Sequence, residues 1–541
     1  MLESYDVIVV GGGHNGLVSA AYLARAGRKV LVVERRSVVG GMCTSEETVA
    51  EAPGYTFNTC GIDTALTNIP SSVIDELELH RYGLRFVRPD PWGAYVNPDG
   101  AKIGLYADRR KTEAEIAHFS RKDAEAFRKF CDTVTEAWWT VVPYFQDHPI
   151  RPSAKTLGQM LYRAAKAHRQ LRDSAQVFLS SPEQVLMERF EREEVRAVLA
   201  NIASWSNLPI QEDGSAGALA MAACYFKWPV TRPVGGAGAF TQALSDCVTA
   251  HGSDVLTNAP VAEILVDSDG AYGVRLQDGR EFRAGQVIGA LDPYTLMNKL
   301  VDSRHVPEQT RNELRGLGAL RWNISAMKAD VVLDRRPALV GGNDLLSGYL
   351  CMAPTLEDVK RAQIQSMAGE VPDLLTMAPI LPALIDRTQV PPGSDGETMY
   401  LYIASVPRDL SGGRDWDDVQ ESTIKSAFSI IEQYLPGFTD SVSAYSIQSP
   451  KHLGTKAHNA CIYHADMNIA QIGPWRPTKS LSGYQTPIPG LWHTAAGAHP
   501  FGALHGWSGR TTARTVERTM RRQELGDKVR SRARSALAGS A

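Results

Sequence analysis

The chain opens with a glycine fingerprint directly after a short apolar run. Residues 6–10 read DVIVV, and such a β-branched run predicts a strand that is buried on both faces. Gly11, Gly13 and Gly16 follow it with the spacing G-x-G-x-x-G. The first glycine permits a tight turn, the second lets the backbone approach a pyrophosphate, and the third lets a helix pack closely on the strand. The stretch therefore predicts a βαβ unit that binds a dinucleotide at the amino end of its helix.

The residues after the fingerprint narrow the choice of dinucleotide. We expect a helix over residues 15–26 and a second strand over residues 29–33, which ends on Glu34. Glu34 lies 18 residues after Gly16, where a carboxylate can accept hydrogen bonds from ribose hydroxyls. A Rossmann domain for NAD has no need of the further pair Gly40–Gly41, whereas similar flavoproteins use such a pair against the pyrophosphate and the flavin. The sequence therefore predicts FAD.

Composition excludes several other classes of protein. The chain has 541 residues, of which 43% are hydrophobic and 22% charged, as expected of a globular protein with two or three domains. A net charge of −3 gives no reason to expect nucleic acid, and no apolar run reaches the length of a membrane span. The seven cysteines lack C-x-x-C spacing, so we expect neither a metal site nor a dithiol centre. The early first strand leaves no room for a leader peptide, and we expect a cytoplasmic protein.

The middle of the chain indicates how the domains are arranged. A glycine-rich loop over residues 232–240 leads into a helix at 241–250, and residues 255–290 read as four short strands separated by Asp-Gly turns. We expect an α/β fold in which a Rossmann-type (GR2-like) FAD-binding domain carries an inserted α+β substrate domain. The expected parts are 1–90, 221–295 and 451–522 for the FAD-binding domain, 91–220 and 296–450 for the substrate domain, and 523–541 for a basic flexible tail.

A helical stretch over residues 154–172 is amphipathic, with basic residues opposite its apolar ones. We expect a surface helix whose apolar side packs on its own core, and a helix that lies on a membrane as the alternative. The apolar set is Leu157, Met160, Leu161, Ala164 and Leu171, and the basic set is Lys155, Arg163, Lys166, Arg169 and Arg172.

Several linked motifs, in order, resemble the FAD-dependent phytoene desaturase and carotenoid isomerase superfamily. The group named for pyridine nucleotide-disulfide oxidoreductase domain-containing protein two is nearest, and the resemblance covers nearly the whole chain. Two motifs depart from the family pattern, at 458–460 and at 500–506. The motifs are the fingerprint with Glu34 and Gly40–Gly41, Gly235–Gly238, Asn258–Glu263, Ala290–Pro293, Pro436–Phe438, Tyr463–Met467, Arg476–Pro477, Ser482–Pro487 and Gly497–Pro500.

The resemblance implies a set of cofactor-binding residues and three candidates for handling a proton. The histidines are His464, His499 and His505, of which we expect His499 to handle the proton, and each has a structural hydrogen-bonding role as the alternative. Asp466 is a weaker candidate. We expect residues 463–466 and 499–506 to face one pocket, with the bulky side chains of the second segment pointing into it. The implied FAD-binding residues are Gly11, Gly13, Asn15, Gly16, Glu34, Arg35, Gly40, Gly41, Met42, Val261, Ala290, Gly497 and Gly506.

The expected activity is the transfer of a hydride from a small, largely apolar or secondary-metabolite substrate to FAD. No second G-x-G-x-x-G follows an internal strand, so we expect no NAD(P)H domain and an electron acceptor that is oxygen, a quinone or another protein. Three alternatives stay open at this point: a redox-neutral isomerase that uses reduced FAD, an amine oxidase-type dehydrogenase, and a flavin-stabilised interaction protein. The sequence does not choose the oligomeric state.

Overall fold

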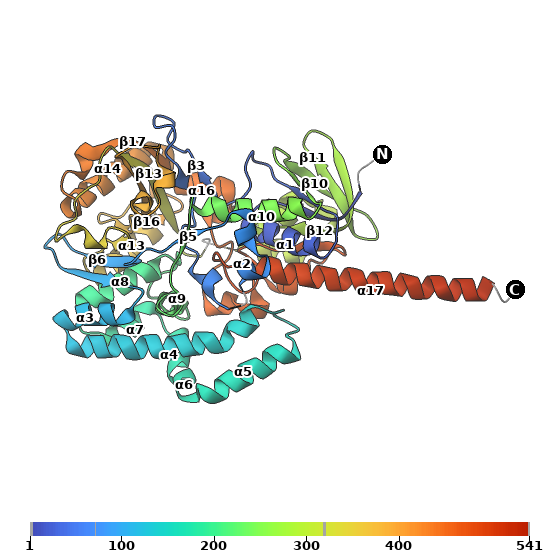
Figure 1. Ribbon diagram of the computed structural model, residues 1–541, viewed down its shortest axis with the longest axis horizontal. Helices are drawn as coiled ribbons and strands as arrows, with labels where there is room; N and C mark the ends of the chain where they lie inside the picture. The colour runs from blue at the N-terminus through green and yellow to red at the C-terminus, as the bar shows by residue number, and fades with distance from the viewer. Residues whose placement is uncertain (1–3, 71, 318–320, 539–541) are drawn as a thin grey trace.

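The amino-terminal fingerprint folds into a βαβ unit at the centre of a seven-stranded sheet (Figure 1). The computed structural model describes residues 4–70, 72–317 and 321–538. β1 (Ser4–Val10) runs parallel to β2 (Val30–Val33) on one side and to β12 (Glu281–Gly289) on the other, with α1 (His14–Arg25) between β1 and β2. β9 (Asp254–Leu256) pairs parallel with β2, and β18 (Leu491–His493) pairs parallel with β12. The predicted Rossmann-type sheet is thus confirmed.

Residues 255–290 form the four expected strands. These are the end of β9, then two antiparallel strands, and then β12. β10 (Val261–Val266) pairs with β11 (Ala271–Leu276), which pairs with the first part of β12. Two long helices, α10 (Ala237–Ala250) and α17 (Trp507–Ala538), pack against α1. Figure 1 shows α17 extending far from the rest of the chain. Residues 523–538 of the expected basic tail continue α17, and 539–541 lie outside the described residues. The flexibility of this tail stays a prediction.

A second unit is built on an antiparallel sheet with the order β15-β16-β13-β17. Its long strands are β13 (Ile324–Leu333) and β16 (Glu397–Pro407), both buried along their whole length, and its edge strands are β15 (Thr376–Met377) and β17 (Val442–Gln448). A smaller sheet joins β6 (Gly93–Val96), β7 (Lys102–Leu105) and β14 (Tyr349–Cys351). The helices of this unit include α13 (Leu356–Met367), α14 (Trp416–Tyr434) and α16 (Pro450–Lys456).

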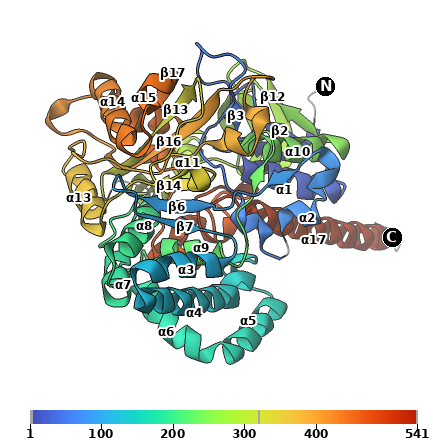
Figure 2. The same cartoon turned by 60° about the vertical axis from the view of Figure 1, so that its left-hand side comes forward.

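Helices from residues 109–224 form a layer beneath these sheets, as Figures 1 and 2 both show. Trp138 and Phe145 on α4 are buried in the core of this layer. Within the described ranges, no helix combines the length and the hydropathy that crossing a membrane requires. The helices are α3 (Arg109–Phe119), α4 (Arg121–Phe145), α5 (Ala154–Lys166), α6 (His168–Leu179), α7 (Pro182–Arg189), α8 (Glu193–Ser204) and α9 (Gly217–Cys224).

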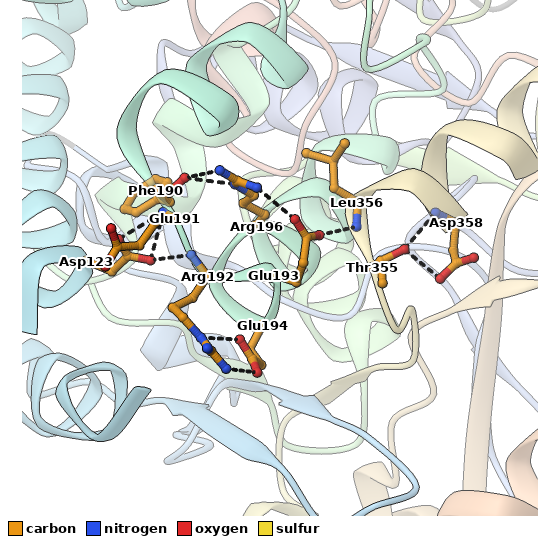
Figure 3. Close-up of polar contacts among 10 residues, drawn as sticks. All are labelled: Asp123, Phe190, Glu191, Arg192, Glu193, Glu194, Arg196, Thr355, Leu356 and Asp358. Atoms are coloured by element: carbon orange, nitrogen blue, oxygen red, sulfur yellow. Dashed lines mark hydrogen bonds and ion pairs between the residues drawn. The ribbon is translucent and has the colours of Figure 1, made fainter. Parts of the chain in front are cut away.

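Figure 3 shows how the helical layer is joined to the rest of the second unit. The buried carboxylate of Asp123 on α4 accepts hydrogen bonds from the backbone N–H groups of Glu191 and Arg192, at 3.0 and 2.8 Å, just before α8 begins. Glu193, the first residue of α8, accepts from the N–H of Leu356 at the start of α13 at 3.4 Å. Residues far apart in the sequence therefore form one connected structure, although the exact domain boundaries stay a prediction.

α5 is a surface helix as expected, but its orientation differs from the prediction. Leu157 and Leu161 are exposed, whereas Thr156 is buried and Met160 and Arg163 are half-buried. The expectation that the apolar side packs on the core is therefore wrong for Leu157 and Leu161, because contacts of Arg163 with α4 hold another side inward, whereas Met160, Ala164 and Leu171 are half-buried.

Candidate functional site

The three fingerprint glycines have distinct geometric reasons to lack a side chain. Gly11 has a φ of +102°, which favours glycine, and a Cβ on Gly16 would lie 2.4 Å from the carbonyl oxygen of Gly11. A Cβ on Gly13, by contrast, would meet no atom within 4 Å. Gly13 is also the residue before α1, and no side chain caps the N–H groups there. The backbone thus offers open space and free donors at one point, as a bound phosphate requires.

The second glycine pair lies directly against the first. The N–H of Gly40 donates to the carbonyl oxygen of Gly12 at 2.7 Å, and a Cβ on Gly41 would stand 3.2 Å from the Cα of Gly13. Met42, the next residue, keeps part of its surface accessible. The structure therefore brings the predicted residues Gly13, Gly40, Gly41 and Met42 together.

The acidic residue at the end of β2 is held by backbone donors. The two carboxylate oxygens of the buried Glu34 accept from the N–H of Gly12 at 2.8 Å and from the N–H of Arg36 at 2.9 Å. Glu34 therefore stands at the same edge of the sheet as the glycines. Arg35 is exposed and donates to the carbonyl oxygen of Thr455 at 3.3 Å. The N–H of Ala259 donates to the carbonyl oxygen of Glu34 at 2.8 Å, and Val261, two residues later, begins β10.

Two helices begin at this edge and pack tightly on each other. A Cβ on Gly509, the third residue of α17, would come within 2.3 Å of the carbonyl oxygen of Asn15, the second residue of α1. The side-chain oxygen of Asn15 accepts from the N–H of Gly509 at 3.4 Å. Because the amino end of a helix carries partial positive charge, two such ends favour an anionic group between them.

Three of the predicted cofactor-binding residues pack against other parts of the protein and do not adjoin open space as Gly13 does. Gly506 has a φ of +71°, and a Cβ there would meet Val73 at 2.9 Å and Val18 at 3.2 Å. Asn15 is occupied by Gly509, as described above. Ala290 directly follows β12, and its Cβ lies 2.7 Å from the position of a Cβ on Gly16. These three residues shape the fingerprint turn, and their contact with a cofactor stays a prediction.

His464 is the predicted histidine with the most open surroundings. Its backbone has a φ of +61°, its Cβ lies 3.0 Å from where a Cβ on Gly497 would stand, and its Nδ1 has no hydrogen-bond partner. The side chain keeps part of its surface accessible. Burial lowers the pKa of His464, Asp292 opposes that shift, and Arg476 adds to it. The imidazole is therefore neutral at physiological pH and can accept a proton.

His499 and His505 are packed within the protein. His505 donates from Nε2 to the carbonyl oxygen of Phe501 at 3.1 Å, and its Nδ1 accepts from the N–H of Trp507 at 2.9 Å, so both ring nitrogens are occupied. The Nε2 of His499 lies 3.1 Å from the carbonyl oxygen of Tyr144, while its Nδ1, like that of His464, has no hydrogen-bond partner among the described residues. Burial lowers the pKa of both histidines to about 3. These contacts favour the structural alternative for both residues.

The loop over residues 499–506 lies against Tyr463, but its bulky side chains do not point into a pocket. A Cβ on Gly502 would stand 2.9 Å from the Cα of Tyr463. Phe501 instead packs 5.5 Å from Trp138 and 5.4 Å from Phe145, measured between ring centroids, and Leu504 belongs to the core around α1. The expected direction of these side chains is therefore wrong, because aromatic partners on α4 surround Phe501.

The sequence did not single out a group of aromatic residues that includes Tyr463, the residue before His464. We call this group the aromatic cluster: Trp205, Tyr225, Tyr349, Tyr402 and Tyr463. Trp205 and Tyr349 have ring centroids 4.8 Å apart, and the Tyr463 hydroxyl donates to the carbonyl oxygen of Trp205 at 2.8 Å. Burial raises the pKa of Tyr463 well above its usual range, and Tyr402, Cys60 and Tyr225 add to that shift.

Members of the aromatic cluster are desolvated yet partly accessible. Tyr225, Tyr349 and Tyr463 keep accessible surface, although burial raises the pKa of each. Cys60 and His14 share this combination, and burial lowers the pKa of His14 to about 4. Such groups lie deep in the fold and still present surface, which is what contact with a small internal ligand requires. The sequence contains one local sign of the aromatic cluster. Tyr402 lies two residues after Tyr400 on one strand, so the two tyrosine side chains share a face of the sheet.

Two buried ion pairs border the aromatic cluster. Arg232 and Asp63 are 2.8 Å apart, and the guanidinium lies 5.8 Å from the Tyr349 ring. Lys328 and Asp330 are 2.7 Å apart, and the ammonium lies 4.6 Å from the ring of Tyr400, whose hydroxyl donates to the carbonyl oxygen of Cys60. Each carboxylate is thus neutralised by a cation.

A Rossmann-type sheet with two glycine turns and two helix amino termini at one edge defines a dinucleotide-binding protein. The chain belongs to the flavin containing amine oxidoreductase family, which matches residues 16–370. It is 29% identical to mouse pyridine nucleotide-disulfide oxidoreductase domain-containing protein 2, over 96% of this chain and 94% of that protein. It is 24% identical to the neurosporene-forming phytoene desaturase of Rhodobacter capsulatus, over 91% and 90% of the two chains.

The fold is also similar to that of a putrescine oxidase variant, with a TM-score of 0.62 and 16% identity over 96% of this chain and 99% of that one. The predicted resemblance to the phytoene desaturase and carotenoid isomerase superfamily is confirmed. FAD is the cofactor, and the chain is an FAD-dependent oxidoreductase. The open face at Gly13, the paired glycines and the uncapped start of α1 fit its pyrophosphate, and Glu34 is placed for its ribose.

Proposed function

We propose that this oxidoreductase removes hydrogen from an apolar carbon substrate bound against the aromatic cluster. The observation that carries the proposal is the pairing of aromatic surface with neutralised carboxylates. Trp205, Tyr349 and Tyr463 offer apolar contact, while Asp63 and Asp330 are both in ion pairs. An apolar ligand gains most from such a surface, because it needs no charged partner.

The same surroundings argue against a cationic amine as the substrate. An ammonium ion would find the carboxylates of Asp63 and Asp330 already paired with Arg232 and Lys328, so neither is free to bind it. Two further acids lie in this region, and both have partners: Asp292, near His464, accepts from the N–H of Thr295 at 2.8 Å, and Asp466, whose pKa burial raises to about 6, lies close enough to Arg476 and Arg321 that their charges lower it. We therefore propose a neutral substrate in preference to the amine alternative.

We assign the protein's chemical contribution to His464. Desaturation removes a hydride from one carbon and a proton from its neighbour, and a double bond forms between them. FAD, when bound, accepts the hydride. The neutral imidazole of His464, whose Nδ1 has no partner, takes the proton. The aromatic cluster orients the substrate and excludes water, which keeps the proton transfer confined to His464.

For the electron acceptor we keep oxygen, a quinone or another protein as the proposal. Within residues 4–70, 72–317 and 321–538, the structure describes one Rossmann-type sheet. The fingerprint at Gly11–Gly16 lies in this sheet, and we assign it to FAD. This supports an acceptor that does not need a nucleotide domain of its own.

The test of the reaction type is product mass. The holoenzyme would be incubated with phytoene, the compound named in the bacterial relative, together with a quinone. A product two hydrogens lighter than the substrate supports dehydrogenation. A product of unchanged mass with altered double-bond geometry would favour the redox-neutral isomerase, and an unchanged substrate with a stably bound flavin would favour an interaction protein.

A further inference from the structure

α5 is held to the protein by the side that carries Thr156 and Arg163. Thr156 donates from its hydroxyl to Asp147 at 2.6 Å, and Arg163 donates to the carbonyl oxygen of Trp139 on α4 at 2.6 Å. The guanidinium of Arg163 also lies 3.7 Å from the Trp139 ring centroid, where a cation–π contact is favourable. The inward side of this helix is therefore fixed by specific contacts, and its outward side is set as a consequence.

The outward side is apolar and exposed. Leu157 and Leu161 lie four residues apart on one helix face, and 47% and 72% of their surfaces are accessible. A Cβ on Gly158, between them, would meet no atom within 4 Å. Tyr162 beside them and Ile150 in the preceding loop are exposed as well. We call Leu157, Leu161 and Tyr162 the α5 ridge. Large apolar groups gathered on one exposed face mark an interaction surface.

Positive charge surrounds the α5 ridge. Residues 150–179 contain six basic residues and one acidic residue, a net charge of +5, whereas the whole chain carries −3. Lys166 extends over the ring of Tyr162, with its ammonium 4.5 Å from the centroid. The exposed basic residues around the ridge are Arg151, Lys155, Lys166, Arg169 and Arg172. This local charge complements an anionic surface.

We propose that the α5 ridge and its basic rim dock onto an anionic lipid bilayer. A helix that lies in the interface needs an apolar face to enter the acyl boundary, basic residues for the headgroups, and an aromatic residue at the level between them. Leu157 and Leu161 supply the first, Lys155 and Lys166 the second, and Tyr162 the third. Figures 1 and 2 show α5 and α6 at the outer limit of the helical layer, where a flat surface can reach them.

The docked face connects to the aromatic cluster through only two helices. α5 packs on α4, α4 packs on α9 (Gly217–Cys224), and Tyr225 of the cluster follows α9 directly. The link between docking and catalysis rests on the proposed function, which is the oxidation of an apolar substrate. Such a substrate concentrates in a bilayer. Docking then places the substrate reservoir against the helices that border the site.

The test uses the holoenzyme and two kinds of vesicle, pure phosphatidylcholine and a mixture of phosphatidylcholine with phosphatidylglycerol. We expect the protein to sediment with the mixed vesicles and to be released by high salt, because basic side chains supply part of the attraction. The double variant Leu157→Glu with Leu161→Glu should lower this binding about tenfold or more. The matched control is Leu525→Glu with Val529→Glu on α17, where two apolar residues are similarly exposed, and it should bind like the unchanged protein.

A second variant reports on the ridge without removing its apolar character. The fluorescence of the tryptophan in Leu161→Trp is obtained by subtracting the emission of the unchanged protein from that of the variant. This difference spectrum should shift to the blue when mixed vesicles are added, and it should not shift with pure phosphatidylcholine vesicles. Absence of binding to mixed vesicles, or a Leu157/Leu161 double variant that binds normally, would overturn the proposal. Loss of binding in the α17 control instead would assign the contact to α17.

The outcomes also separate this inference from the proposed function. Flavin content, and flavin reduction by a detergent-dispersed substrate, should be equal in the Leu157/Leu161 double variant and the unchanged protein. Normal reduction together with no vesicle binding overturns docking alone. Vesicle binding together with no reduction by any apolar substrate overturns the proposed function alone.

Discussion

Gly509 of α17 lies against Asn15 of α1 so closely that a Cβ on the glycine would come within 2.3 Å of the Asn15 carbonyl oxygen. This contact sets the distance between the two helix amino termini at the cofactor edge. Gly509→Ala should push them apart, and we expect a lower ratio of bound flavin to protein and a lower melting temperature. Absorbance of the purified protein and a thermal melt in the presence of FAD measure both.

The matched control is Gly526→Ala on the same helix. A Cβ there would have Arg530 Nη2 as its nearest neighbour, at 3.7 Å, so nothing needs to move. Alanine should leave flavin content unchanged and stabilise the helix by about 0.5–1 kcal/mol. Equal flavin content in the two variants would show that the contact between α1 and α17 does not support the cofactor.

Two fingerprint glycines should fail in different ways. A side chain at Gly13 meets no protein atom, so Gly13→Val should fold normally and lose FAD. A side chain at Gly16 would meet the Gly11 carbonyl oxygen at 2.4 Å, so Gly16→Ala should destabilise the protein itself. The unchanged protein should be yellow and release its FAD on denaturation. A Gly13→Val variant that retains the flavin would place the pyrophosphate elsewhere.

His464 should matter for turnover and His505 for stability. His464→Gln should slow flavin reduction by the substrate about a hundredfold, the usual scale for losing a general base, with flavin content unchanged. His505→Gln should lower the melting temperature and leave reduction of the holoenzyme unchanged, because both ring nitrogens of His505 serve the protein backbone. Slow reduction in a His499→Gln variant, with a normal His464→Gln variant, would restore His499 as the base.

Stability should fall as the solution becomes acidic. Burial lowers the pKa of His14 and His493 from 6.5 to about 4 in the folded protein. Between these values the unfolded chain binds more protons than the folded one, so the free energy of unfolding decreases as the pH falls from about 6.5 to about 4. Each histidine contributes on the order of 3 kcal/mol. Urea unfolding at a series of pH values measures this, and a constant midpoint from pH 7 to pH 5 would contradict it.

The dinucleotide half of the site could be predicted because its signals are local. The spacing of Gly11, Gly13 and Gly16 and the strand periods over 255–290 each lie within one short stretch. The aromatic cluster could not, because Trp205, Tyr349 and Tyr463 come from segments that only the tertiary fold brings together.

Two errors share a physical cause. Periodicity shows that α5 has an apolar face, but Arg163 and its contact with Trp139 decide which way that face points. The loop at Phe501 likewise depended on partners that are distant in sequence, since Trp138 lies more than 360 residues earlier. A local pattern identifies a surface, and the packing partner determines its direction.

We propose that this FAD-dependent oxidoreductase takes electrons from an apolar carbon substrate at the aromatic cluster. The most direct measurement is anaerobic stopped-flow absorbance of the bound flavin after mixing with phytoene, with putrescine, or with NADPH. The account predicts that phytoene or a related apolar alkene bleaches the flavin, and that putrescine and NADPH leave it oxidised on the same time scale. Rapid bleaching by NADPH or by the amine, with no effect of any apolar alkene, would contradict it.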